Sequence, residues 1–284
     1  AMTNITFQYN ASAASGSGSG SNAGTYNGNG TAWMVKDIRS GSSPSSPQHL
    51  AAVGNTLYFS ADDGTNGAEL WKSDGTASGT VMVKDINSGT STSGLLYPTA
   101  IGNTLFFYAT DASNGYELWK SDGTASGTVM VKDIRGGSWA SSPKYLTAVG
   151  NTLYFEANDG INGAELWKSD GTASGTVMVK DIYSGMGSSD LDHLTAVGNT
   201  LYFKANDGTN GWELWKSDGT ASGTVMVKNI RSGSSGGNIK YITAIGNTLY
   251  FSASDGTSGD ELWKSDGTAS GLSLIHISEP TRRT

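Results

Sequence analysis

One stretch recurs five times in this chain without a change of letter: Glu-Leu-Trp-Lys-Ser-Asp-Gly-Thr, first at residues 69–76. Its tryptophans are Trp71, Trp119, Trp167, Trp215 and Trp263, each 48 residues after the one before. A fixed period of roughly 20 to 50 residues is typical of repeat architectures, in which each unit buries its apolar surface against its neighbours. The repeat therefore decides the fold.

Each 48-residue unit contains four short apolar stretches separated by Gly, Asn and Asp. In the first full unit they are residues 49–53, 56–61, 69–73 and 80–86, which we name strands A to D. Stretches of this length bounded by turn residues predict β-strands. Apolar residues occur on both faces of the expected sheet, so each sheet must be covered on both sides. This is typical of the blades of a β-propeller.

The hairpin between strands C and D has a self-consistent register. Placing Trp71 opposite Met82 also places Glu69 opposite Lys84, on one face of the sheet. Opposite charges that face each other across two strands stabilise a sheet. We therefore expect an ion pair between Glu69 and Lys84.

Counting the strands predicts a closed ring. Residues 31–38 match strand D alone, four complete units follow up to residue 230, and residues 239–266 match strands A to C. The first strand D can pair with the last strand C, which removes two exposed sheet edges. The sequence thus predicts an all-β, five-bladed β-propeller of four-stranded blades, closed by its N-terminal strand D and monomeric.

The two ends of the chain depart from the repeat. Residues 1–30 are rich in Ser, Gly, Asn and Ala, a composition typical of a linker. Residues 31–271 form the expected propeller. Residues 272–284 resemble a translated sequencing adaptor, so we left them out of the fold prediction and expect the native gene to continue beyond residue 271.

The composition argues against several classes of function. The net charge of −7 and the isoelectric point near 4.9 disfavour nucleic acid and anionic membrane surfaces as partners. No apolar run approaches the roughly 20 residues needed to cross a bilayer. The chain has no cysteine, which excludes disulfide bonds and thiolate chemistry.

The repeated motif resembles that of a known family. Glu-Leu-Trp-x-x-Asp-Gly-Thr, followed by Gly79-Thr80 and by Val-Lys-Asp-Ile at residues 83–86, is similar to the repeats of bacterial ELWxxDGT proteins. The resemblance covers residues 31–271. It implies a large exported bacterial protein, extracellular or at the cell surface, and brings no catalytic residue with it.

The recurring acidic residues favour structural roles. Asp74 and its four copies precede a glycine, and an aspartate that accepts backbone N–H groups in such a turn explains Asp-Gly-Thr. Asp63 and its copies lie in the loop between strands B and C, where calcium is a possible ligand, although the spacing differs from that of a known calcium loop. No residues are placed to converge in a catalytic site, so we expect no enzyme and no obligatory cofactor.

The near-identical units differ mainly on one rim of the expected ring, formed by the B–C loops and the D–A connections. Exposed aromatic and basic side chains gather there, a mixture that suits sugar rings or a protein partner. The candidate ligand-binding residues are Trp139, Trp212, Tyr116, Tyr183, Arg39, Arg135 and Arg231. We expect a non-enzymatic adhesion module that recognises glycan or a cell-surface protein. The alternatives are a structural spacer, a protein-interaction scaffold and simple drift of tolerant loops.

Overall fold

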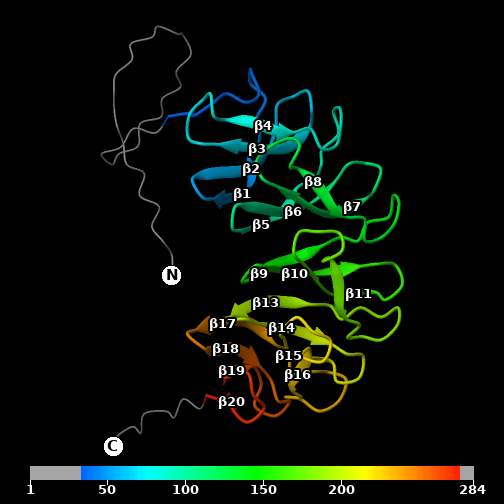
Figure 1. The fold of residues 1–284 in the computed structure, drawn as a ribbon. Coiled ribbons are helices and arrows are strands. Elements are labelled where there is room, and N and C mark those ends of the chain that lie inside the picture. Colours follow the sequence, from blue (N-terminus) through cyan, green and yellow to red (C-terminus); the bar gives the residue numbers. More distant parts are fainter. Residues whose placement is uncertain (1–32, 276–284) are drawn as a thin grey trace, which may run out of the picture.

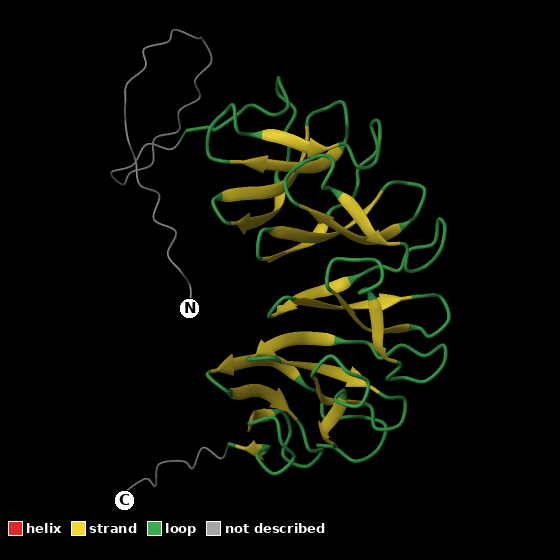
Figure 2. Cartoon of the chain, in the orientation of Figure 1, coloured by secondary structure: helices red, strands yellow, loops and turns green. Residues whose placement is uncertain are grey.

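The structure, a computed structural model, describes residues 33–275, and all of its regular elements are β-strands. The strands form five four-stranded antiparallel sheets, which we call blades 1 to 5 in chain order. The blades follow one another along a curved stack, and no helix occurs in the described part (Figures 1 and 2). Within residues 33–275 there is accordingly no helix that could cross a membrane. The predicted repeat of four-stranded units is confirmed, and the arrangement is consistent with a β-propeller.

Each blade has the strand order A-B-C-D. The A strands are β1 (Gln48–Val53), β5 (Leu96–Ile101), β9 (Lys144–Val149), β13 (Asp192–Val197) and β17 (Lys240–Ile245). The B strands are β2 (Thr56–Asp62), β6 (Thr104–Thr110), β10 (Thr152–Asn158), β14 (Thr200–Asn206) and β18 (Thr248–Ala253). The C strands are β3 (Ala68–Ser73), β7 (Tyr116–Ser121), β11 (Ala164–Ser169), β15 (Trp212–Ser217) and β19 (Glu261–Ser265). The D strands are β4 (Val81–Lys84), β8 (Val129–Lys132), β12 (Val177–Lys180), β16 (Val225–Lys228) and β20 (Ser273–Leu274).

Neighbouring A strands contact each other, and they line the concave side of the stack (Figure 1).

The Asp-Gly-Thr segment forms the turn that the sequence predicts. Asp74 Oδ1 accepts hydrogen bonds from the backbone N–H of Thr76 at 2.9 Å and from its hydroxyl at 2.7 Å. The Thr76 hydroxyl oxygen accepts the N–H of Gly79 at 2.9 Å. A Cβ at Gly79 would overlap the Asp74 carboxylate, so glycine is required there.

The register of the C–D hairpin is confirmed only at the tryptophan. Trp71 lies opposite Met82, but a bulge between Leu70 and Trp71 places Leu70 opposite Lys84. The predicted ion pair between Glu69 and Lys84 is therefore wrong. The bulge directs the Lys84 side chain toward the next blade, since one extra residue re-aims the strand.

In the next blade the Lys84 ammonium donates a hydrogen bond to the backbone carbonyl of Thr128 at 2.8 Å. It also lies 5.9 Å from the centre of the Trp119 ring, a cation–π contact. Lys132 and Lys180 repeat both contacts in the following blades. The lysine thus joins neighbouring blades rather than two strands of one blade.

The hydrophobic core consists of layers between blades. In the first layer, Tyr58 and Leu70 of blade 1 pack against Leu105, Phe107 and Trp119 of blade 2. Similar clusters lie between the later blades. A large apolar side chain contributes about 1.5–3 kcal/mol when it is fully buried, so these layers supply most of the stability.

The stack is open, and the predicted closure is wrong. Blade 1 and blade 5 lie at opposite ends of the arc (Figure 1). The strand that pairs with β19 is β20, with Trp263 opposite Leu274, the position predicted for Met34. Residues 34–38 instead pack on blade 1, where Ile38 joins the cluster that contains Phe59 and Trp71.

Residues 272–275, which we had left out of the fold prediction, therefore belong to blade 5. Leu272 is 4% exposed and lies in the core of that blade, and β20 completes the sheet. Leu272 and Leu274 occupy the places of Thr224 and Met226 in blade 4, so the alternation of side chains along the strand is preserved. The predicted linker 1–30 and residues 276–284 lie outside the described residues.

Candidate ligand-binding grooves

The variable rim is built by the D–A connections, each of which passes from one blade to the next. The first connection follows β4, and its Ser93 is hydrogen-bonded to both blades. The Ser93 N–H donates to Ala68 O at 3.2 Å, and the Ser93 carbonyl accepts the N–H of Thr110 at 3.0 Å. The connection is therefore hydrogen-bonded both to strand C of blade 1 and to strand B of blade 2.

A buried glutamate holds both ends of this connection. Glu69 is fully buried, and its carboxylate accepts the backbone N–H of Ile86 and that of Ser93, each at 2.8 Å. Burial disfavours the charged form and raises the Glu69 pKa to about 7, although the N–H groups of Ile86 and Ser93 act against the rise. Glu117, Glu165 and Glu213 are buried in the same way, and burial raises their pKa values, to about 8 for Glu165 and about 7 for Glu213.

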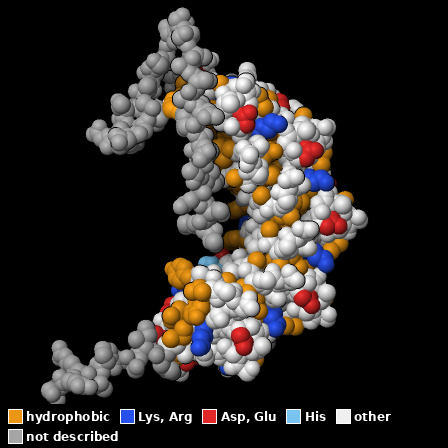
Figure 3. Space-filling view, turned by 60° about the vertical axis from the view of Figure 1, so that its left-hand side comes forward, with side chains coloured by type: hydrophobic (Ala, Val, Ile, Leu, Met, Phe, Trp, Pro, Cys, Tyr) orange, Lys and Arg blue, Asp and Glu red, His pale blue; other side chains and the backbone are white. Residues whose placement is uncertain are grey.

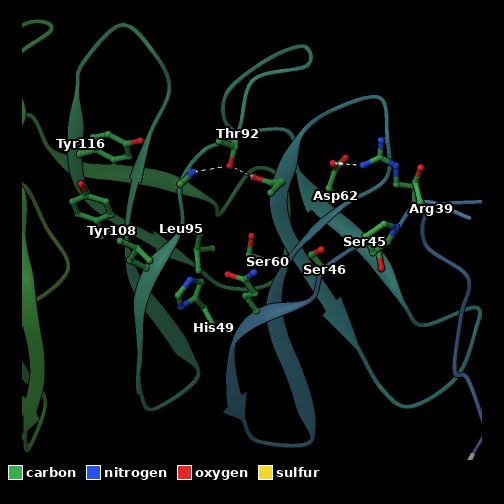
Figure 4. Close-up of a pocket in the computed structure, with 16 residues that line it drawn as sticks. Arg39, Ser45, Ser46, His49, Ser60, Asp62, Thr92, Leu95, Tyr108 and Tyr116 are labelled. Atoms are coloured by element: carbon green, nitrogen blue, oxygen red, sulfur yellow. Dashed lines mark hydrogen bonds and ion pairs between the residues drawn. The ribbon is translucent and has the colours of Figure 1, made fainter.

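One groove, groove 1, has a volume of about 600 Å³ and lies between blades 1 and 2 (Figure 4). Its aromatic wall is Tyr108 and Tyr116, whose rings are stacked with centroids 4.6 Å apart and planes 8° apart. Burial and the neighbouring Tyr116 raise the pKa of Tyr108 to about 12, so its hydroxyl stays protonated. His49 lies on the floor, between the tyrosines and the opposite wall.

The opposite wall of groove 1 is an ion pair. The Arg39 guanidinium lies 2.6 Å from Asp62 Oδ2, and both side chains are about one-third exposed. Arg39 also packs on Gly64 of the B–C loop, where a Cβ would lie 3.1 Å from the Arg39 Nε. The charge of Arg39 is therefore partly neutralised, and polar atoms line this side of the groove.

A second groove, groove 2, lies between blades 4 and 5 and has a volume of about 320 Å³. Its lining includes Trp212, 36% exposed, and Arg231. The Lys204 ammonium lies 5.8 Å from the centre of the Trp212 ring, and Asp260 accepts hydrogen bonds from the amide of Asn238 at 2.9 and 3.0 Å. Grooves 1 and 2 thus use the same positions of the repeat with different side chains.

The remaining predicted residues lie outside both grooves. Trp139 is 67% exposed on the connection between blades 2 and 3, and the Arg135 guanidinium lies 5.3 Å from the centre of its ring. Tyr183 packs against Gly208 on the connection to blade 4. The structure therefore groups Arg39 with Tyr116 and Trp212 with Arg231, and does not bring the seven residues into one site.

Sequence analysis missed a row of strained residues on the concave side. His49, Tyr97, Tyr145, His193 and Tyr241 all have positive φ, from 53° to 57°. Bulky residues rarely adopt this conformation. Each lies at the bulge of its A strand, and Tyr97, Tyr145 and His193 line a shallow pocket of about 350 Å³. The restriction of this position to His or Tyr is visible in the sequence, but its backbone conformation is not.

The aspartate side chains of the B–C loops accept hydrogen bonds from residues of their own loops. Asp63 Oδ1 accepts the N–H groups of Thr65 and Asn66 at 2.8 and 2.9 Å, and Oδ2 accepts the Asn66 amide at 2.8 Å. Burial alone would raise the Asp63 pKa, but these hydrogen bonds outweigh it and lower the pKa to about 2. In residues 33–275 no three His, Asp or Glu side chains are grouped as metal ligands would be.

No protein-family model and no curated protein sequence matches the chain. Solved structures do resemble it. A puromycin hydrolase S511A mutant complexed with PGG is similar with a TM-score of 0.54 and 12% identity, over 84% of this chain and 38% of that one. Prolyl oligopeptidase B from Galerina marginata is similar with a TM-score of 0.53 and 11% identity, over 81% of this chain and 36% of that one.

These likenesses show the fold alone. Since the chain spans less than two fifths of either protein, their activities are not carried over to it.

Proposed function

We propose that this protein is a non-enzymatic module that binds carbohydrate in the grooves of its variable rim, outside a bacterial cell. The observation that carries the proposal is groove 1, where the stacked Tyr108 and Tyr116 face the ion pair of Arg39 with Asp62. Sugars present apolar faces that pack on aromatic rings, and hydroxyl groups that need polar partners. The extracellular placement rests on the resemblance of the repeat to exported bacterial proteins.

The size and charge of groove 1 fit such a ligand. Pockets for small ligands are typically about 300–1,000 Å³ and combine apolar walls with a few polar groups. The protein is acidic overall, and the Arg39 charge is engaged by Asp62. Neutral sugars therefore suit the groove better than strongly anionic ones. Groove 2, with Trp212 beside Lys204 and Arg231, offers a more basic setting for a second specificity.

A glycan array with the full chain tests the proposal. We expect Tyr116→Ala to abolish or strongly weaken retention assigned to groove 1, and Trp212→Ala to do the same for groove 2. The control is Ile161→Ala, because Ile161 is 71% exposed and lines neither groove. Unchanged retention in both groove variants, with unchanged melting temperatures, would contradict the proposal. Loss on Tyr145→Ala alone would place binding in the concave pocket instead.

A structural spacer is the second candidate. It is favoured by the near-identical contacts between blades, such as the bonds of Lys84, Lys132 and Lys180 to the next blade. A folded protein that retains no sugar and no protein partner would support this function over the first.

A further inference from the structure

The junctions between blades share one pattern. Each blade presents a forward face, defined in blade 1 by Tyr58, Leu70 and Lys72, to the rear face of the next blade, defined in blade 2 by Leu105 and Gly123. The Lys72 ammonium donates to the Gly123 carbonyl at 2.8 Å, and the Tyr58 hydroxyl fills the space beside Gly123. The equivalent lysine bonds recur at the other three junctions: Lys120 to Gly171, Lys168 to Gly219 and Lys216 to Gly267.

Within residues 33–275, blade 5 leaves its forward face uncovered. Leu262 is 44% exposed, whereas the equivalent leucines Leu70, Leu118, Leu166 and Leu214 are 0% exposed. Ile245 is 67% exposed, and Tyr250 is half-buried where Tyr58 and its other equivalents are buried. Lys264, the equivalent of Lys72, is exposed and lacks a hydrogen-bond acceptor among residues 33–275.

On the rear face of blade 1, the positions of Leu57 and Gly75 are left uncovered by residues 33–275. Leu57 is 37% exposed, whereas its equivalents Leu105, Leu153, Leu201 and Leu249 are at most 1% exposed. Among residues 33–275, and apart from its two chain neighbours, no residue has a heavy atom within 4 Å of the Cβ position of Gly75, the equivalent of Gly123. Part of this face is already covered in the manner of a junction, because Lys36 donates to Thr80 O at 2.7 Å and Ile38 joins the cluster of Phe59.

The two uncovered faces are thus the two halves of one interface that the chain forms four times internally. The apolar residues and the Lys264 ammonium on one side correspond to Leu57 and the Gly75 carbonyl on the other. Figure 3 shows hydrophobic side chains gathered at the lower, C-terminal part of the molecule. Exposed apolar patches of this kind mark sites of association.

We propose that the forward face of blade 5 docks on the rear face of blade 1 in a second copy of this chain, head to tail. Ile245, Tyr250 and Leu262 pack on Leu57, and Lys264 donates to the Gly75 carbonyl. Such a contact joins two different surfaces, so it continues into a closed ring of copies or into an open filament. The inference does not depend on the proposed function.

The test is the mass of the full chain in solution, measured by light scattering after gel filtration over a range of concentrations. We expect the mass to rise above that of the monomer as the concentration increases. Leu262→Glu and Leu57→Glu should each abolish the rise, because each places a carboxylate in an apolar contact. Both positions are exposed in the single chain, so both variants should keep the parent melting temperature. Met186→Glu, at a site 84% exposed on a connection, is the matched control and should associate normally.

A mixture of Leu262→Glu and Leu57→Glu distinguishes this contact from any other mode of association. Leu262→Glu keeps an intact rear face and Leu57→Glu keeps an intact forward face, so the mixture should form a dimer and nothing larger. A monomer at every concentration would overturn the proposal. So would a monomer whose scattering profile is that of a closed ring, because the last blade would then have docked on the first blade of its own chain.

Discussion

Asn229 donates its side-chain amide to Oδ1 of Asn210 at 2.8 Å, a contact between strand D and the B–C loop of blade 4. The preceding three blades carry aspartate at the position of Asn229: Asp85, Asp133 and Asp181. In each of these aspartates Oδ1 is buried and has no hydrogen-bond partner in the described part of the chain. The single asparagine therefore satisfies a site that the aspartates leave unsatisfied.

This difference predicts that Asp181→Asn stabilises the protein. The new amide can donate to Asn162, the equivalent of Asn210, and we expect the free energy of unfolding to rise by about 1 kcal/mol. Urea titration monitored by tryptophan fluorescence measures the change, and Asn229→Asp is the control that should lower stability by a similar amount. If Asp181→Asn instead lowers stability only when calcium is present, a bound cation satisfies the aspartate in the parent protein.

Ala112 has a φ of 70°, whereas the other four blades carry glycine at this place in the B–C loop: Gly64, Gly160, Gly208 and Gly256. An L-residue in this conformation is strained by roughly 1 kcal/mol, so Ala112→Gly should raise the free energy of unfolding by a comparable amount. The reverse change, Gly160→Ala, should destabilise by more, because its Cβ would lie 3.0 Å from the Arg135 Nε. Thermal denaturation of both variants checks this, and a lower melting temperature for Ala112→Gly would count against it.

The buried glutamates predict that stability falls as the pH rises. Glu69 and Glu213 have pKa values near 7 and Glu165 near 8, all above the ordinary value of 4.5. At pH values between the ordinary pKa of 4.5 and the raised pKa values, the folded state therefore holds more protons than the unfolded state. Their contribution is fully present below about pH 4.5 and is lost as the pH rises through about 7 to 8. We expect a lower melting temperature at about pH 8.5 than at about pH 5.

Glu165→Gln provides the control for this dependence. The variant should lose part of the decrease between the two pH values, because one titrating group is removed. It should also be less stable at about pH 5, since its amide N–H₂ must take the place of one carboxylate oxygen and face the backbone N–H of either Ile182 or Ser189. A melting temperature that is flat or rises toward alkaline pH in the parent protein would show that these carboxylates stay ionised.

The C–D hairpin turns give a further prediction. A Cβ at Gly127 would overlap the Asp122 carboxylate, whose Oδ1 accepts the N–H of Thr124 at 2.8 Å. Gly127→Ala should therefore destabilise the protein by about 1–3 kcal/mol, as a strained turn with a lost hydrogen bond does. Gly54→Ala is the comparison, because apart from its chain neighbours none of residues 33–275 lies within 4 Å of its Cβ position, and the positive φ of 58° opposes the change. Calorimetry of the two variants should rank Gly127→Ala as the more harmful.

The sequence predicted the number of blades, their strands except the last strand D, and the Trp71–Met82 pairing, because a 48-residue period and regular turn residues are local signals. It gave the wrong partner for Glu69, because a bulge between Leu70 and Trp71 leaves no mark on the pattern of apolar residues. Glu69 binds two N–H groups of the connection, a contact between residues 24 apart that no hairpin register contains.

The sequence predicted that the candidate site lies on the variable rim, but it did not predict that the site is divided into separate grooves. The divergence of the units located Tyr116 and Trp212, which do line grooves 1 and 2. Which rim residues share a groove depends on how neighbouring blades are placed, and Trp139 lies apart for that reason. The predicted closure is wrong because Leu272 and Leu274 complete the sheet of blade 5. They take the place beside β19 that the sequence analysis assigned to the N-terminal strand D.

Because the Glu69 carboxylate binds the N–H groups of both Ile86 and Ser93, the variable segment between these two residues begins and ends at fixed points of the backbone. The same carboxylate that stabilises the junction thus sets the span of this loop. A loop of new sequence grafted between residues 86 and 93, or at the corresponding place in another blade, would inherit a rigid base. Each junction with such a glutamate in this respect carries one loop whose two ends are held by a single buried side chain.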